Sequence, residues 1–397
     1  GGMDEEPPSN CVIFRQGDRY EIVPYRETVK KASQQDGTPK LLAESAFATA
    51  LVKLTRSKKA VVCVLTGHGE RPLKAEDGSI VGSRKLSSSK QLSLSKLADQ
   101  LKKDNMQVKS LNLRTSDSIP DGCRALVVPG PRVPFTNGEM EKIKTYLQDR
   151  GGSLLVMIDS STATSNGTRL GPMRDLLLEH GIKVHTDAVG MVKSPAIAVG
   201  QQGLVKVNSA RQTVPVKTEG YQDHPVNSGL TNYTVAMTQS APITVMNESL
   251  PSGLQVQPLL TAVENSWGET ELESGSEKAT YDDGKDVEGP VVLAAVARQK
   301  SGGPTPRNSR IIVVASSLSF TNTAIDQNPA NLYFLQNAIN WLARRKALLG
   351  IPAEDIQFNL AQLSPAQVRA ARWLFVGLIP AAVIAAGIAV WRLRSKS

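Results

Sequence analysis

The side chains that could do chemistry follow apolar runs of the sequence. Gly67-His68-Gly69-Glu70 follows Ala60–Leu65, and Asp159-Ser160-Ser161 follows Ser153–Ile158. If these runs are strands of an open α/β sheet, the polar residues meet at its carboxyl edge, where such sheets bind ligands. The candidate binding residues are the polar side chains that follow these two runs and a third, later one: His68, Glu70, Asp159, Ser160 and Asn322.

A histidine, a serine and an aspartate at one edge are the residue types of a hydrolase triad. A serine nucleophile on such a sheet normally occupies a sharp G-x-S-x-G turn, whereas Ser160 lies in Ile158-Asp159-Ser160-Ser161-Thr162, without flanking glycines. Alternatively, Gly67 and Gly69 only permit a turn, and Asp159 and Ser160 satisfy loop backbone groups. We therefore expect no catalytic residue, and a membrane-tethered hydrolase using His68 and Ser160 is the rival hypothesis.

Other kinds of site have no motif in the sequence. The three cysteines form no C-x-x-C pair and the four histidines no H-E-x-x-H, so we expect no metal site. No G-x-x-x-x-G-K-[ST] is present, so we expect no nucleotide hydrolysis and no cofactor. The formal charge is +9, but lysine and arginine are dispersed without interleaved aromatics, and we expect no nucleic-acid partner.

The elements that position the candidate residues alternate between strands and helices across residues 60–188. One amphipathic stretch begins with a capping box of Thr136 and Glu139 and ends at Gly151-Gly152. Such alternation predicts an α/β domain with a mostly parallel sheet and helices on both faces. We expect the loops Thr66–Glu70 and Ser316–Asn322 to lie side by side. If His68 and Phe320 are near this edge but buried, the edge is structural.

Residues 189–345 predict a β-rich insertion, with an acidic, exposed excursion at Ser266–Lys285. Its last apolar runs, Val291–Ala297 and Ile311–Ala315, are expected to rejoin the sheet, and an amphipathic helix follows at Asn331–Arg345. Residues 1–59 predict a hairpin within Cys11–Val23 and a helix at Ala43–Arg56.

Residues 346–372 predict a linker, and residues 373–391 (WLFVGLIPAAVIAAGIAVW) predict one C-terminal transmembrane helix. These 19 residues carry no charge, and a tryptophan marks each end. At about 1.5 Å per residue they span a hydrocarbon core of about 30 Å. The flanking positive charges favour a cytoplasmic tail, which places the soluble domain outside the cytoplasm.

Several segments occur together in the order of a known family: Glu44–Arg56, Val64–Glu70, Leu126–Pro131, Gly151–Asp159, His224–Leu230, Phe320–Asn322 and Asn337–Leu342. With the proline-broken C-terminal span, they resemble the GldG-type auxiliary component of ABC transport systems, a family named for bacterial gliding motility. The resemblance implies a flavodoxin-like domain similar to class I glutamine amidotransferases but without their catalytic residues. Asp159-Ser160 stands roughly where such an enzyme would have its cysteine, and Ser316-Ser317-Leu318-Ser319 replaces an acidic turn that is frequent in the family.

The resemblance also implies a separate permease and a separate ATPase as partners, and a soluble domain between two membrane helices. This sequence, which begins Gly1-Gly2-Met3, contains only the second helix, so we expect a truncated or internal start. Our leading hypothesis is a non-enzymatic, membrane-anchored accessory subunit of an ABC transporter in the bacterial inner membrane. It would engage an unknown cargo or envelope component. A structural cell-envelope protein is a further alternative.

Overall fold

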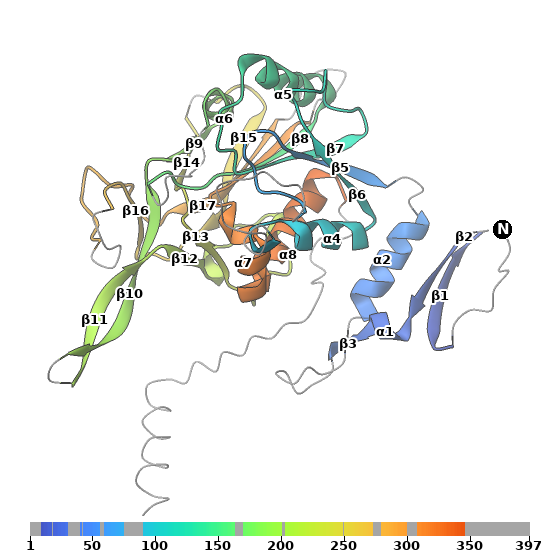
Figure 1. The fold of residues 1–397 in the computed structure, drawn as a ribbon, viewed down its shortest axis with the longest axis horizontal. Coiled ribbons are helices and arrows are strands. Elements are labelled where there is room, and N and C mark those ends of the chain that lie inside the picture. The colour runs from blue at the N-terminus through green and yellow to red at the C-terminus, as the bar shows by residue number, and fades with distance from the viewer. Residues whose placement is uncertain are drawn as a thin grey trace, which may run out of the picture. The chain divides into compact units, whose positions relative to one another are not determined.

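The computed structural model describes residues 9–17, 19–30, 40–41, 43–55, 59–74, 90–162, 170–200, 203–248, 250–272, 279–299 and 308–345 (Figure 1). All of them belong to one compact unit, Gly1–Glu354, and Asp355–Ser397 forms a second unit. No helix within the described residues is long and apolar enough to cross a membrane. The linker predicted at 346–372 and the membrane helix predicted at 373–391 lie outside the described residues.

A nine-stranded sheet lies at the centre of the described fold, in the order β6-β5-β7-β8-β18-β17-β14-β9, with β15 paired to β17. From β6 to β18 the strands run parallel. Their bounds are β5 (Ala60–Leu65), β6 (Met106–Leu111), β7 (Cys123–Pro129), β8 (Ser153–Met157) and β18 (Arg310–Val314). All residues of β8 and β18 are buried, as expected for parallel strands that are covered on both faces. The predicted α/β class with a large, mostly parallel sheet is therefore confirmed.

The other side of the sheet is antiparallel. β17 (Val292–Gln299) pairs antiparallel with β18, and β14 (Ile243–Val245), β9 (Ile182–Val184) and β15 (Leu254–Thr261) continue the pattern. The chain between β17 and β18 is shorter than the dozen or so residues that a parallel crossover needs, so the two strands form a hairpin. The late apolar runs thus join the central sheet, as expected. The domain boundaries themselves stay predictions.

Helices lie on both faces of the sheet: Figure 1 shows α5 (Asn137–Arg150) and α6 (Met173–Glu179) on one face and α4 (Ser95–Lys103), α7 (Asn322–Gln327) and α8 (Pro329–Leu342) on the other. The capping box that predicts the start of α5 is present, since the Thr136 hydroxyl accepts from the Glu139 amide and the Glu139 side chain accepts from the Thr136 amide. Gly151 ends α5 in the left-handed conformation, with φ at 60°.

The N-terminal elements form a hairpin and a helix, as predicted. β1 (Cys11–Gln16) pairs antiparallel with β2 (Arg19–Pro24), and the rings of Phe14 and Phe47 lie 5.3 Å apart, which joins the hairpin to α2 (Ala43–Thr55). Shorter elements complete this region: α1 (Tyr25–Thr28), β3 (Val29–Lys30) and β4 (Lys40–Leu41).

The predicted β-rich region contains one element that the sequence interpretation got wrong. β10 (Val189–Gly200) pairs with β11 (Gly203–Arg211) and with β16 (Ser266–Glu269), while β12 (Thr213–Val216) pairs with β13 (Val235–Thr238). Because Trp267 packs in a small core with Val189 and Met191, the start of the excursion at Ser266–Lys285 is a buried strand and not an exposed loop.

Candidate functional site

The loops after β5, β8 and β18 meet at the carboxyl edge of the parallel strands. Arg71 Nε donates to Ser317 Oγ at 3.0 Å, and Arg71 Nη2 donates to Asp159 Oδ2 at 3.1 Å. Gly130, at the end of β7, permits this approach, because a Cβ at that position would lie 2.4 Å from Ser317 Oγ. The expected meeting of these loops is confirmed. Arg71, which holds them together, was missed although it directly follows Glu70 in the sequence.

Asp159 is a buried carboxylate that joins two of these loops. Its Oδ1 accepts from the backbone amides of Ser317 at 2.6 Å and Leu318 at 3.0 Å. Its Oδ2 accepts from the Ser317 hydroxyl and from Arg71. Charge-assisted hydrogen bonds of this kind are stronger than neutral ones. The carboxylate therefore acts as a clamp between the β8 and β18 loops.

Ser160 lies next to this clamp in the interior of the protein. Its amide donates to Gln239 O at 3.1 Å, its Oγ accepts from the Thr162 amide at 3.2 Å, and the residue is 0 % exposed. No hydrogen bond joins Ser160 to His68, both of which the structure describes. The two residues of the rival hydrolase hypothesis are thus at the same edge but are not paired.

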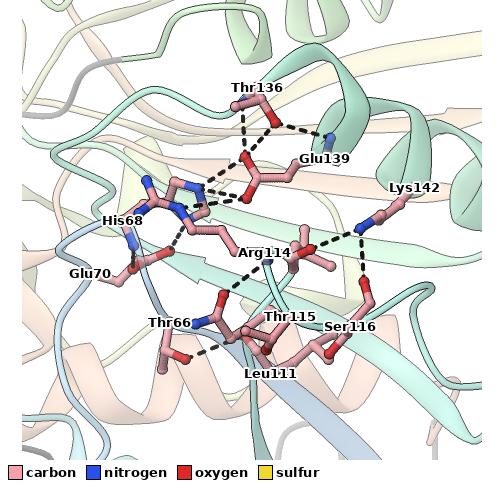
Figure 2. Close-up of polar contacts among 12 residues, drawn as sticks. Thr66, His68, Glu70, Leu111, Arg114, Thr115, Ser116, Thr136, Glu139 and Lys142 are labelled. Atoms are coloured by element: carbon pink, nitrogen blue, oxygen red, sulfur yellow. Dashed lines mark hydrogen bonds and ion pairs between the residues drawn. The ribbon is translucent and has the colours of Figure 1, made fainter.

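His68 is buried between two glutamates (Figure 2). Its Nε2 lies 3.2 Å from Glu139 Oε2, its Nδ1 lies 3.3 Å from Glu70 Oε1, and the Phe135 ring lies 4.2 Å away, centroid to centroid. Glu70 also accepts from the His68 amide at 2.6 Å. Glu139 is the capping-box residue of α5, so the same carboxylate caps a helix and faces the imidazole.

The charges around His68 favour its protonated form. Burial alone would lower the pKa of His68, but hydrogen bonds and charge attraction from Glu70 and Glu139 outweigh burial and raise it above its ordinary value. Burial opposes ionisation of Glu139, yet hydrogen bonds from Thr136 and His68 lower the pKa of that carboxyl. An imidazolium between two carboxylates lacks the free lone pair that a general base needs.

Asn322 caps a helix that lies far from it in sequence. The N-cap position of α4 is Leu94, whose side chain cannot accept a hydrogen bond. Asn322 Oδ1 accepts instead from the Lys96 amide at 3.0 Å, while Asn322 Nδ2 donates to Lys90 O at 2.8 Å and Ser95 Oγ at 2.8 Å. This side chain therefore ties the loop after β18 to the start of α4.

The predicted site residues thus have structural roles at a packed junction of loops. His68 is 1 % exposed and Phe320 0 %, so both side chains are buried. Within the described ranges, no group of three or more histidine, cysteine, aspartate or glutamate residues could hold a metal ion. Ligand binding by His68, Glu70, Asp159, Ser160 and Asn322 stays a prediction.

Curated relatives match only a small part of the chain. The intraflagellar transport protein 52 homolog of Mus musculus is 34 % identical over 87 residues, which are 22 % of this chain and 20 % of that protein. The homolog of Homo sapiens is 33 % identical over 87 residues, 22 % of this chain and 19 % of that protein. The chain therefore spans about a fifth of the length of these relatives.

Solved structures resemble the chain weakly over a larger part of its length. The mmIFT52 N-terminal domain has a TM-score of 0.44 and 18 % identity, covering 71 % of this chain and 96 % of that chain. A Bacteroides uniformis protein described as ThuA-like has a TM-score of 0.37 and 12 % identity, covering 72 % and 93 %. A protein of Thermoplasma acidophilum described as a GMP synthase subunit has a TM-score of 0.32 and 12 % identity, covering 73 % and 96 %. All three TM-scores are below 0.5, so none of these likenesses carries an argument about activity.

A family model matches most of the chain. It is an auxiliary family described as "ABC-type uncharacterized transport system", and it matches residues 59–350. That range contains the central sheet, the loops at its carboxyl edge and helix α8. The narrower GldG and gliding-motility assignment stays a prediction. Since the match covers well over half of the 397 residues, this chain belongs to the auxiliary family of ABC-type uncharacterized transport systems.

Proposed function

We propose that this protein is a non-catalytic, membrane-anchored accessory subunit of a bacterial ABC transport system, working with a separate permease and a separate ATPase. Family membership supports the transport role. The observation that carries the non-catalytic role is the arrangement at the carboxyl edge. There, Asp159 accepts hydrogen bonds from Arg71, Ser317 and Leu318, and both ring nitrogens of His68 face carboxylates.

The chemistry of covalent hydrolysis supports this choice over the hydrolase alternative. A serine nucleophile needs an adjacent base that takes its proton, and the base needs an open lone pair. His68 faces Glu70 and Glu139, and Ser160 is buried next to Thr162. Each of these residues thus serves the packing of its own loop, and Ser160, which is 0 % exposed, does not present its hydroxyl to a substrate carbonyl.

The proposed place of the protein in the cell follows from the sequence. Residues 373–391 form the anchor in the inner membrane, and the α/β domain lies on the extracytoplasmic side. The anchor binds the permease, and the soluble domain engages a cargo or an envelope component.

Purification of the tagged full-length protein from native membranes tests the assembly. We expect one ABC permease and one ATPase with a Walker A motif to co-purify in constant ratio, as measured by quantitative mass spectrometry. A variant that ends after Arg372 is the control, and it should appear in the soluble fraction without the permease. Recovery of the full-length protein without either subunit would contradict the proposal.

A screen with esterase, amidase and peptidase substrates tests the absence of catalysis. We expect no turnover that depends on Ser160 or His68. Ser160→Ala is compared with Ser161→Ala, a matched change at the neighbouring hydroxyl. Turnover that is lost in Ser160→Ala and His68→Gln but kept in Ser161→Ala would favour the hydrolase.

A further inference from the structure

Four arginines gather at the amino edge of the central sheet, at the opposite ends of the strands from the loops described above. Arg298 and Arg310 are direct partners across β17 and β18, so their side chains leave the same face with Cβ atoms about 5 Å apart. Arg344 follows the C-terminus of α8, and Arg124 lies at the start of β7. Arg310 Nη1 and the Arg344 amide both donate to Trp341 O, so these two arginines are near neighbours. Besides burial, the charges of Arg124 and Arg298 lower the pKa of Arg344, and the charge of Arg298 lowers that of Arg310.

The positive charges of this cluster are not neutralised by nearby carboxylates. None of the four arginines forms an ion pair in the part of the chain that the structure describes. Arg310 is 7 % exposed, and the buried Nε atoms of Arg298 and Arg310 have no acceptor among the described residues. Burial, and then the charges of Arg344 and Arg298, lower the pKa of Arg310 to about 10. Like charges in direct cross-strand contact destabilise a sheet.

Some of these arginines also have a structural role. Arg310 Nη1 donates to Trp341 O, and its guanidinium carbon lies 4.4 Å from the centroid of the Trp341 ring. Arg344 Nη2 donates to Gly151 O at 3.1 Å and to Asn308 O at 2.6 Å. Arg298 differs from both, because none of the hydrogen bonds of the described residues uses its guanidinium. It is half-buried, and its charge adds only repulsion to the cluster.

His224 supplies a neutral ring beside the arginines. Its ring lies 4.8 Å from that of Trp341, and its Nδ1 accepts from the Val226 amide at 3.2 Å. In the neutral imidazole the proton is then on Nε2, which makes that atom a donor. Asp223 is exposed and is the carboxylate whose charge reaches His224. The cluster therefore offers several donors, and the carboxylate beside His224, that of Asp223, lies at the surface.

We propose that Arg298, Arg310 and Arg344 form a binding site for a phosphate-bearing anion. Guanidinium groups match the oxygens of a phosphate in paired hydrogen bonds, and several positive charges match a dianion better than a single carboxylate. The same chemistry serves a free phosphate and a phospholipid headgroup. The site does not depend on the accessory role proposed above, because it rests on the charges and contacts of the amino edge alone.

Isothermal titration of the full-length protein with inorganic phosphate, at constant ionic strength, tests the site. We expect saturable binding that is weakened at least about tenfold in Arg298→Gln, since that change removes one guanidinium fork. Arg174→Gln, an equal change of charge at an exposed position of α6, should bind like the wild type. If Arg298→Gln does not fold, Arg298→Lys is used instead. It keeps the positive charge but lacks the paired donors of the guanidinium, so it should weaken binding several-fold. Absence of phosphate binding in the wild type, with no stabilisation by anionic lipid in the second experiment, overturns the proposal.

Reconstitution of the full-length protein in lipid nanodiscs separates the two sources of phosphate. If a headgroup fills the site, discs that contain phosphatidylglycerol raise the Tm over phosphatidylcholine discs, and Arg298→Gln removes the difference. If free phosphate fills it, both discs give the same Tm, and added phosphate raises it by about 5 °C at saturation. Without ligand, Arg298→Gln should unfold at the same temperature as the wild type or higher, because it relieves repulsion. A lower Tm together with unchanged binding would show a structural role only.

Discussion

At the carboxyl edge of the central sheet, buried charges lie against opposite charges, whereas at the amino edge like charges lie together. The pKa values of His68 and His224 shift in opposite directions and show this difference between the two edges. The carboxylates Glu70 and Glu139 raise the pKa of His68 despite its burial. Burial and then Arg310 lower the pKa of His224 to about 4. A compensated cluster stabilises the fold without any ligand, while an uncompensated one costs stability until an anion arrives. The comparison therefore indicates that the charged groups of the carboxyl edge stabilise the fold, whereas those of the amino edge bind an anion.

The largest effect is expected for Asp159→Ala at the carboxyl edge. The change leaves the largely buried Arg71 side chain without its carboxylate and removes the acceptor of the Ser317 and Leu318 amides. Loss of one partner of a buried pair costs about 3–5 kcal/mol. Chemical denaturation should show a decrease of this size in the free energy of unfolding.

Asp159→Asn and Asp223→Ala are the controls for this change. Asp159→Asn keeps the shape and one acceptor oxygen, so it should lose less stability than Asp159→Ala. Asp223→Ala removes an exposed carboxylate at the amino edge and should change stability by less than about 0.5 kcal/mol. Equal losses in Asp159→Ala and Asp223→Ala would remove the contrast between the two edges.

A smaller loss is expected for Asn322→Ala. It removes the acceptor for the Lys96 amide at the start of α4 and the donor to Lys90 O. Loss of a helix cap costs about 1–2 kcal/mol. Asn322→Asp keeps the acceptor and should recover about half of the loss when unfolding is measured in urea. A full loss in Asn322→Asp would show that the amide donors, and not the cap, matter most.

Much of the fold is predictable because its signals are local. The run Ala60–Leu65 is apolar throughout, and the capping box of Thr136 and Glu139 is complete within one turn, so β5 and α5 appear at their predicted places. β16 was missed because its residues are polar or small around a single tryptophan, and its burial depends on pairing with β10. The antiparallel half was missed because apolar runs do not show the direction of a strand.

The candidate site was predictable in position but not in chemistry. Parallel topology brings the loops after β5 and β18 together, as expected. The partners of His68 could not be found in the same way, since Glu139 is far from it in sequence. The pairing of Arg298 with Arg310 depends on the register of β17 and β18. The sequence did contain one signal for this pairing: Arg298 directly follows the apolar run Val291–Ala297, and Arg310 directly precedes the next one, Ile311–Ala315.

The stability contributed by His68 should decrease with rising pH. Its pKa is raised above the unfolded value of 6.5, so the contribution is complete below pH 6.5 and is lost as the pH rises through the folded pKa. Glu139 acts in another window, because its pKa is lowered and its contribution is lost only as the pH falls below 4.5. The difference in free energy of unfolding between wild type and His68→Gln should therefore shrink as the pH rises above 6.5.

His185→Gln is the control for this pH dependence. Burial, and then Lys183, lower the pKa of His185, so its contribution is lost as the pH falls and not as it rises. If the difference in free energy of unfolding from the wild type changes with pH in the same way for His68→Gln and His185→Gln, then Glu70 and Glu139 do not keep His68 protonated.

The smallest effect is expected at His224, where the environment of the amino edge can be read without unfolding the protein. With a pKa of about 4, its imidazole signals in NMR should stay those of a neutral ring between about pH 5 and about pH 8, whereas an ordinary histidine titrates there. Arg298→Gln removes one of the positive charges that lower this pKa, so the titration of His224 should move upward. Bound phosphate should move it in the same direction, since an anion favours the imidazolium. If phosphate raises the pKa of His224 in the wild type but not in Arg298→Gln, the anion lies beside both His224 and Arg298. If phosphate leaves the pKa of His224 unchanged, any bound anion lies elsewhere.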